Sequence, residues 1–128
     1  MTDKNVQLRK DTAVQFLELV VAGQIDDAFR QYVDMDGTHH NQYSGAGFPS
    51  LRQAMFEAHR MFPDNEFHIM NVIGEKELVA VHSHLVQNPG AKHFTTVHIF
   101  RFNGEKITEV WDCIQPLSSD SPNKDGAF

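Results

Sequence analysis

The first half of the chain has apolar residues at the three- and four-residue spacing of amphipathic helices. This spacing predicts a helix over residues 5–22, a second and shorter helix over 25–33, and a third over 50–62. A glycine follows the first helix and a proline closes the third, as expected at helix ends. Between the second and third helices, residues 38–43 predict a short strand, and residues 44–49, with two Gly and one Pro, predict a loop.

After residue 63 the apolar period changes to two, which is typical of strands. Four strands are predicted, at residues 66–73, 78–87, 93–102 and 107–115. The short breaks between them contain the Gly, Asn and Pro residues of turns, so successive strands should pair as an antiparallel meander. Helices followed by antiparallel strands predict an α+β domain in which the helices pack on one face of a curved sheet.

The length of 128 residues fits one domain, which we expect to cover residues 1–116. The last segment, 117–128, is rich in Ser, Asp, Pro, Asn and Gly and predicts a flexible C-terminal tail.

The charge balance and the apolar runs exclude several classes of protein. Lys and Arg number 11 against 17 Asp and Glu, a formal net charge of −6, which argues against a nucleic-acid partner. No apolar run approaches the ~20 residues of a membrane span, and the polar first five residues show no signal peptide. The single cysteine, Cys113, allows no disulfide within the chain. These features favour a cytoplasmic protein that binds neither nucleic acid nor a membrane.

Several short segments carry a resemblance to a known family: Tyr32-Val33, His39-His40-Asn41-Gln42-Tyr43, Phe48-Pro49-Ser50-Leu51, Ala54-Met55, Phe62-Pro63, Leu78-Val79-Ala80-Val81-His82-Ser83, Phe100-Arg101-Phe102 and Glu109-Val110-Trp111-Asp112-Cys113-Ile114-Gln115-Pro116. In these segments, and in its order of helices and strands, the chain resembles the SnoaL-like polyketide cyclases of the nuclear transport factor 2-like superfamily, especially a group of predicted aldol-condensation enzymes. The resemblance spans roughly residues 5–116.

The resemblance implies a cone-shaped α+β barrel and a small polyketide-like or β-dicarbonyl substrate bound in an apolar cone. It implies acid/base catalysis of an aldol condensation or cyclisation, with no metal and no cofactor. It also implies a homodimer that pairs through the outer face of the sheet, where we expect Val97, Ile99 and Trp111 to lie.

Asp112 is the first candidate catalytic residue. Strand alternation places it on the same face as Val110 and Ile114, and a carboxylate on an apolar face is costly unless it is paired or takes up a proton. A solvent-exposed face, or a structural partnership of Asp112 with an Arg or a His, would also explain this position. The resemblance favours catalysis, since the cyclases have a pocket Asp on the matching strand.

His98 is the second candidate, because it alternates with Phe100 and Phe102 on an apolar face. In the cyclases a pocket His lies on the strand before the Asp strand, so the resemblance gives His98 the role of orienting Asp112 or stabilising an oxyanion. A two-residue turn at Asn103-Gly104 would place His98 and Asp112 on opposite sides of the sheet. A turn at Phe102-Asn103 with a bulge at Gly104 would place them on one face, as the catalytic interpretation requires.

We expect five further residues to bind the substrate: His40, Asn41, His84, Phe100 and Tyr32. His40 is chosen over its neighbour because two adjacent residues of a regular strand cannot both point inward. Asn41 has the alternative role of holding a backbone loop.

Two rival functions remain open at this point. One is a non-catalytic domain of the same fold that binds a small ligand. The other is a metal site built from His82, His84 and His98, the first two of which share a face of one strand.

Overall fold

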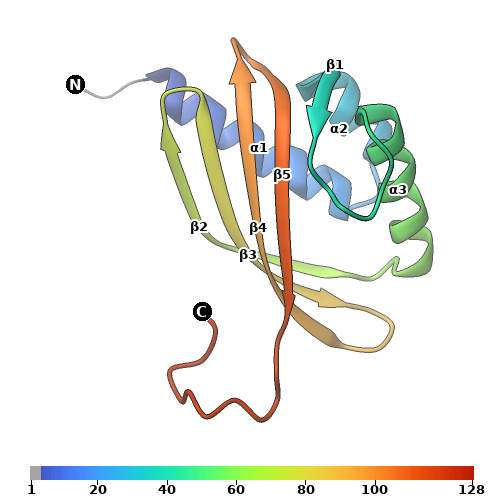
Figure 1. The fold of residues 1–128 in the computed structure, drawn as a ribbon, viewed down its shortest axis with the longest axis vertical. Coiled ribbons are helices and arrows are strands. Elements are labelled where there is room, and N and C mark those ends of the chain that lie inside the picture. The colour runs from blue at the N-terminus through green and yellow to red at the C-terminus, as the bar shows by residue number, and fades with distance from the viewer. Residues whose placement is uncertain (1–3) are drawn as a thin grey trace.

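The structure is a computed structural model, and it describes residues 4–128. It has the element order α1 (Lys4–Val21), α2 (Ile25–Tyr32), β1 (Val33–His39), α3 (Phe48–Met61), β2 (Glu66–Glu75), β3 (Leu78–Gln87), β4 (Lys92–Asn103) and β5 (Lys106–Pro116) (Figure 1). The predicted order of helices and strands is confirmed. Residues 1–3 of the predicted domain lie outside the described residues, and the domain boundary at residue 116 and the flexible tail beyond it stay predictions.

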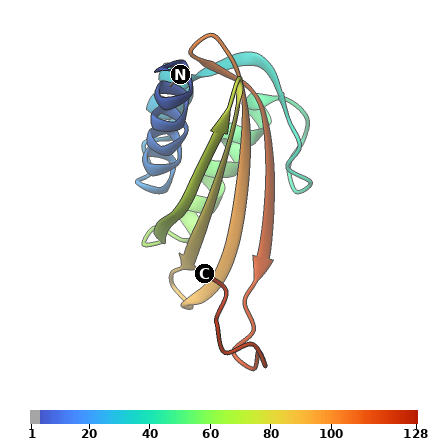
Figure 2. The same ribbon diagram turned by 90° about the vertical axis from the view of Figure 1, so that its left-hand side faces the viewer.

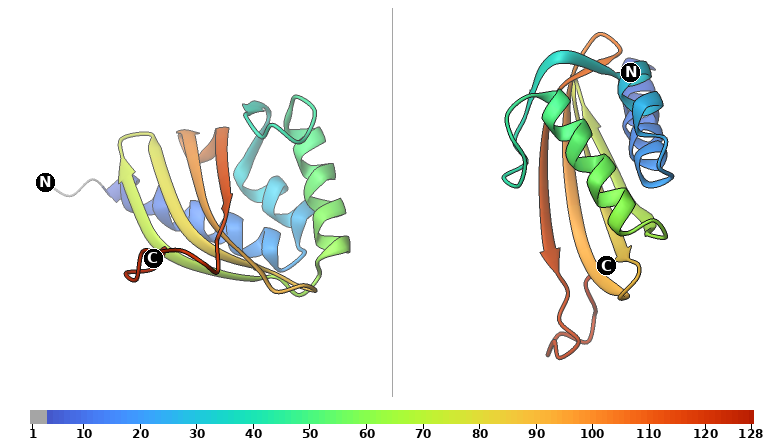
Figure 3. Two further views of the ribbon diagram at one scale, coloured as in Figure 1. Left: turned by 60° about the horizontal axis from the view of Figure 1, so that its bottom comes forward. Right: turned by 90° about the vertical axis from the view of Figure 1, so that its right-hand side faces the viewer.

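The five strands form one sheet in the order β1-β5-β4-β3-β2. The strands from β2 to β5 pair antiparallel as predicted, whereas β1 pairs with β5 in parallel. The sheet is strongly bent and the helices lie along its concave side (Figures 2 and 3). Because β1 and β2 are its two edges, the sheet is curved but unclosed, so the fold is the α+β type that was predicted, as an open cone.

The core lies between the helices and the concave face of the sheet. Phe16 of α1 packs edge-on against Phe29 of α2 and Phe100 of β4, with ring centroids 5.3 and 5.8 Å apart. The apolar faces that predicted the helices are the faces buried here, including Ala13, Phe16 and Leu17 of α1. No helix among residues 4–128 is both long and apolar enough to span a membrane.

The short strand between α2 and α3 differs from its prediction. It runs over Val33–His39 and not over residues 38–43. Gly37 lets this strand approach β5 closely, since a Cβ built there would lie 2.1 Å from the Thr108 carbonyl oxygen. The chain then leaves the sheet at His40, whose backbone N–H donates to the Val110 carbonyl over 2.8 Å, and the following loop lies beside β5.

Candidate active site on the concave face

Three adjacent rows of side chains cross the concave face, each formed by residues that pair directly across the strands. The first row, Val79, Phe100 and Val110, is fully buried beneath the helices. The second row is Val81, His98 and Asp112, and the third is Ser83, Thr96 and Ile114. The catalytic candidates therefore lie where the apolar core gives way to polar side chains.

His98 and Asp112 are directly opposite each other and share the concave face. Neither of the two turns considered from the sequence forms. The hairpin turns at Gly104-Glu105 instead, and the pairing shifts beyond Phe102, so that Thr108 is the extra residue of β5. This bulge gives the side-by-side arrangement that the catalytic interpretation requires.

Asp112 is half-buried and has one of its two carboxylate oxygens occupied. The Asn41 side-chain amide donates to its Oδ2 over 2.8 Å. The other oxygen, Oδ1, has no hydrogen-bond partner within residues 4–128. The carboxylate is therefore held in place while one oxygen remains available for proton transfer.

His98 lies in an apolar setting. Its ring stacks beside Phe100, with centroids 6.1 Å apart, and meets the edge of Phe67 at 6.4 Å. Its Nδ1 is buried and has no hydrogen-bond partner among the described residues, and no hydrogen bond joins it to Asp112 in that part of the chain. Burial lowers the pKa of His98 below its usual range, although the charge of Asp112 acts in the opposite direction. His98 is therefore neutral near pH 7.

Asn41 is positioned by a residue that the sequence interpretation passed over. The backbone N–H of Asn41 donates to His39 Nδ1 over 3.1 Å, and His39 Nε2 lies 2.7 Å from the Gly45 carbonyl oxygen. The Asn41 side-chain oxygen accepts from the Tyr43 backbone N–H over 2.8 Å. His39 thus anchors the loop that presents Asn41 to Asp112. Asn41 has the loop-holding role considered for it, through its contact with the Tyr43 backbone N–H, and its substrate-binding role stays a prediction.

The choice of His40 as the inward-facing residue is wrong. His39 is the buried member of the pair, with its ring 6.2 Å from that of Phe48. His40 lies on the convex face, where it stacks on Trp111 at 5.1 Å and makes a 2.7 Å contact with Glu109. The error follows from the register of β1, because His39 pairs with the buried Val110 of β5 and therefore points to the same concave face.

Of the three remaining predicted substrate-binding residues, His84 and Tyr32 lie away from the Asp112 site, whereas Phe100 lies next to His98 on the same face. His84 is on the convex face, where its Nε2 lies 2.9 Å from His93 Nδ1. Phe100 is fully buried in the core. Tyr32 hydrogen-bonds to Gln15 and lines a separate cleft of about 370 Å³ near the turn between β4 and β5.

The three-histidine metal site that was considered as a rival does not form. His82 and His84 point to the convex face, as their pairing partners Val97 and Thr95 do, whereas His98 points to the concave face. The three imidazoles lie on opposite sides of the sheet and cannot bind a common ion. No group of three or more potential metal ligands converges within residues 4–128.

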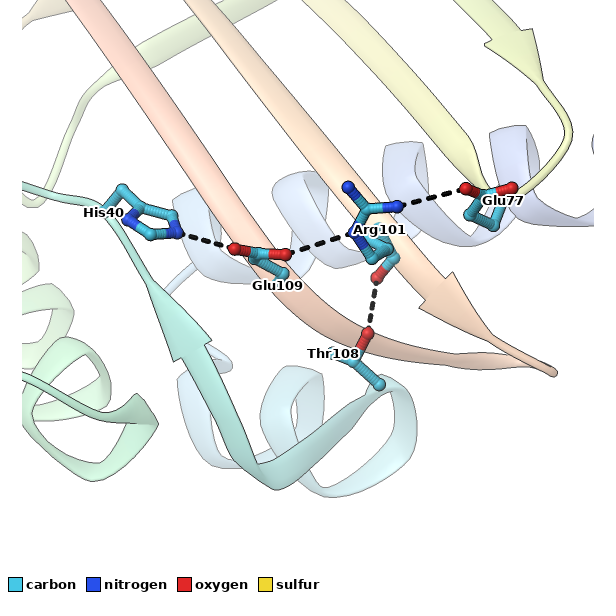
Figure 4. A network of polar contacts seen from close by, with 5 residues as sticks. All are labelled: His40, Glu77, Arg101, Thr108 and Glu109. Atoms are coloured by element: carbon cyan, nitrogen blue, oxygen red, sulfur yellow. Dashed lines mark hydrogen bonds and ion pairs between the residues drawn. The ribbon is translucent and has the colours of Figure 1, made fainter.

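The convex face carries a connected set of polar side chains in which Glu109 contacts His40 and Arg101, and Arg101 contacts Glu77 (Figure 4). Arg101 donates to Glu109 over 3.1 Å and to Glu77 over 3.0 Å, and its guanidinium lies 5.6 Å from the Trp111 ring centre. Contacts with His40 and Arg101 lower the pKa of Glu109. The Arg101 carbonyl accepts from the Thr108 hydroxyl over 3.3 Å. These contacts tie the end of β1 to β5 and β4 on the side away from α1.

Residues 13–110 match the model of the SnoaL-like domain. The chain belongs to the SnoaL-like domain family. No curated protein matches it.

Solved structures of low sequence identity share the SnoaL-like fold. A nuclear transport factor 2-like protein of unknown function from Burkholderia xenovorans LB400 has a TM-score of 0.75 at 15% identity, over 94% of this chain and 92% of that one. A candidate SnoaL-like polyketide cyclase from Jannaschia sp. CCS1 has a TM-score of 0.74 at 15% identity, over 89% of this chain and 90% of that one. AclR, a candidate hydroxylase from Streptomyces galilaeus, has a TM-score of 0.74 at 18% identity, over 86% of this chain and 90% of that one. At these identities the likeness establishes the fold of the chain, not its chemistry.

Proposed function

We propose that this SnoaL-like protein is an acid/base enzyme that enolises a small ketone and promotes its aldol condensation or cyclisation. Asp112 Oδ1 takes the proton from the carbon next to a carbonyl group, and the neutral imidazole of His98 donates a hydrogen bond to the enolate oxygen. The enolate carbon then bonds to a second carbonyl carbon. The alkoxide formed there takes the proton back from Asp112, so the residue ends as it began.

The observation that supports this proposal is the pairing of Asp112 with His98 on the concave face. Asn41 occupies one carboxylate oxygen and leaves the other free, and a buried ring nitrogen opposite it lacks a partner. A base with a free oxygen beside a neutral hydrogen-bond donor is the minimum that enolisation requires. The name of the Jannaschia neighbour, a candidate polyketide cyclase, agrees with a polyketide-like or β-dicarbonyl substrate.

A direct test measures exchange of the protons next to a carbonyl with solvent deuterium, by NMR, for a panel of ketones that includes acetophenone and β-dicarbonyl esters. Wild-type protein should speed the exchange for at least one of them. Asp112→Asn should lower that rate by about 10²–10⁴-fold, the usual contribution of a general base. An Asn side-chain oxygen still accepts from Asn41, so the fold should remain intact.

Asp36→Asn is the matched control, because Asp36 is an exposed residue of β1, and it should keep the wild-type rate. Two results would overturn the proposal. One is the absence of exchange for every ketone that binds, which would favour a non-catalytic ligand-binding domain. The other is a loss of stability of several kcal/mol in Asp112→Asn, the cost of breaking a buried pair, which would make Asp112 a structural residue.

A further inference from the structure

The third row of the concave face contains two hydroxyl groups that the proposed chemistry does not use. Ser83 of β3 and Thr96 of β4 pair directly across the sheet, and they are 0% and 4% exposed. Neither hydroxyl has a hydrogen-bond partner within residues 4–128. Paired residues point to the same side, so the two hydroxyls lie next to each other on the face that carries His98 and Asp112.

Two adjacent buried hydroxyls without partners are unusual in a native protein, because each loses its hydrogen bonds to water on folding. Ala and Val would fill the same places without that cost. His98 Nδ1, one row away on the same strand, is unpartnered in the same way. Three unsatisfied polar groups on one patch of the concave face indicate that the patch receives oxygen atoms from a bound molecule.

The spacing of the rows sets the shape of that molecule. Successive residues on one face of a strand are two positions apart, which is about 7 Å along the strand. The Ser83–Thr96 pair is therefore about 7 Å from the row of His98 and Asp112. The side chains nearby are largely apolar: Ile114 pairs with Thr96, and Phe67 contacts the His98 ring.

A cleft of about 480 Å³ reaches this region at Phe67. It is lined by the end of α1 and by the segment that leads into β2. The Phe67 ring also meets the edge of the His98 ring at 6.4 Å, so this one side chain borders both the cleft and the row of His98 and Asp112.

We propose that the substrate carries two oxygen functions about 7 Å apart, and that Ser83 and Thr96 bind the second one while His98 and Asp112 act on the ketone. This inference rests on the proposed function. Each hydroxyl can donate and accept, so the pair accommodates either a hydroxyl or a carbonyl oxygen. The substrate class is then a compact, largely apolar ketone with a distal oxygen, of which a para-hydroxylated aryl methyl ketone is the simplest example.

Binding of two matched probes tests the inference without requiring turnover. The probes are 4-hydroxyacetophenone, which has a distal hydroxyl, and acetophenone, which lacks it, and dissociation constants are measured by NMR titration. Wild-type protein should bind the hydroxylated probe about tenfold more tightly, the effect of one net hydrogen bond. The double variant Ser83→Ala, Thr96→Val should bind both probes equally, with the acetophenone constant unchanged.

Two further variants complete the design. Thr95→Val removes a hydroxyl from the convex face of the same strand, where Thr95 contacts His82, and it should keep the wild-type preference. Thr96→Ser retains a hydroxyl and should keep most of the wild-type preference for the hydroxylated probe. Removing unpartnered hydroxyls should not lower the unfolding midpoint of the double variant.

The inference is overturned if wild-type protein shows no preference between the probes, if it binds neither, or if the preference survives in the double variant. The double variant could also lose the preference because it unfolds. If Thr96→Ser then shows no preference either, the hydroxyls are structural, and this result overturns the inference as well. A preference without any deuterium exchange would leave the subsite standing and remove the proposed function, so the two failures are distinguishable.

Discussion

His98 is a half-buried base whose protonation the fold opposes. Its ring lies between Phe100 and Phe67, and its Nδ1 has no partner in the described part of the chain. The cost of placing a charge there lowers its pKa, and the nearby carboxylate of Asp112 offsets only part of that cost. The neutral imidazole is thus the form that the folded protein favours.

The direction of this pKa shift predicts how acid affects stability. Below the ordinary pKa of about 6.5 the unfolded chain takes up the His98 proton before the folded chain does. The free energy of unfolding should therefore fall as the pH drops below this value, by at most ~1.4 kcal/mol per pH unit for one proton. Above it, both states are neutral at His98 and the contribution is constant.

An NMR titration of the His98 ring checks this prediction, with the resonance assigned by its loss in His98→Gln. Its midpoint should lie below 6.5, and His98→Gln should lose less stability than wild type between about pH 7 and pH 5, by the slope for one proton. A midpoint at or above 6.5 would show that the charge of Asp112 outweighs burial, and that the two residues form an ion pair.

At the scale of the elements, the bounds of strands with strong alternation could be predicted from the sequence, and the bounds of β1 could not. The boundaries of β3 are those expected, because Val79, Val81 and the residues between them alternate clearly. The sequence of β1 alternates acidic residues with Met and Gly, and Val33 also continues the helical spacing of α2. This strand is held by its long-range pairing with β5, which local patterns do not report.

The register of the hairpin formed by β4 and β5 could not be predicted from the sequence either. Shifting a strand by one residue moves every side chain to the other face, and the bulge at Thr108 decides where Asp112 points. The candidate pair, Asp112 and His98, could therefore be named from the sequence, but its geometry depended on a single extra residue. His39 was missed for a related reason, since its direction depends on the register in which β1 pairs with β5.

Gly37 gives a prediction at this scale. A Cβ at this position would lie 2.1 Å from the Thr108 carbonyl oxygen and 2.7 Å from the Phe48 ring. Because a backbone atom cannot move aside easily, Gly37→Ala should push β1 away from β5 and lower the free energy of unfolding by about 2–3 kcal/mol. Urea unfolding measures this change.

Gly45→Ala is the matched control for Gly37→Ala, because its Cβ would approach only the flexible Ser50 side chain, at 3.3 Å. It should change the unfolding midpoint much less. Equal midpoints for the two variants would show that the contact between β1 and β5 is not tight, and that something else holds the loop of Asn41 beside Asp112.

At the scale of the whole molecule, the two faces of the sheet differ in what covers them. The helices bury the concave face (Figure 3). The convex face presents Ile99 and Trp111 as a cross-strand pair, with Val97 next along β4 and Ile73 on β2, which is 67% exposed. The C-terminal Phe128 covers only one end of this face, where its ring stacks on His82 and His84. An apolar face of this kind favours association.

We predict that the protein is a homodimer that pairs through this convex face. Ile99→Arg places a charge in its apolar centre, which a monomer tolerates and a packed interface does not. Sedimentation at micromolar concentration should give twice the subunit mass of 14.6 kDa for wild type and 14.6 kDa for Ile99→Arg.

Glu105→Lys, a change of charge in the exposed turn between β4 and β5, should remain dimeric. A wild-type mass of one subunit would contradict the dimer. A dimeric Ile99→Arg would place the interface elsewhere, and the exposed Ile73 and the half-buried Trp111 would then require another explanation.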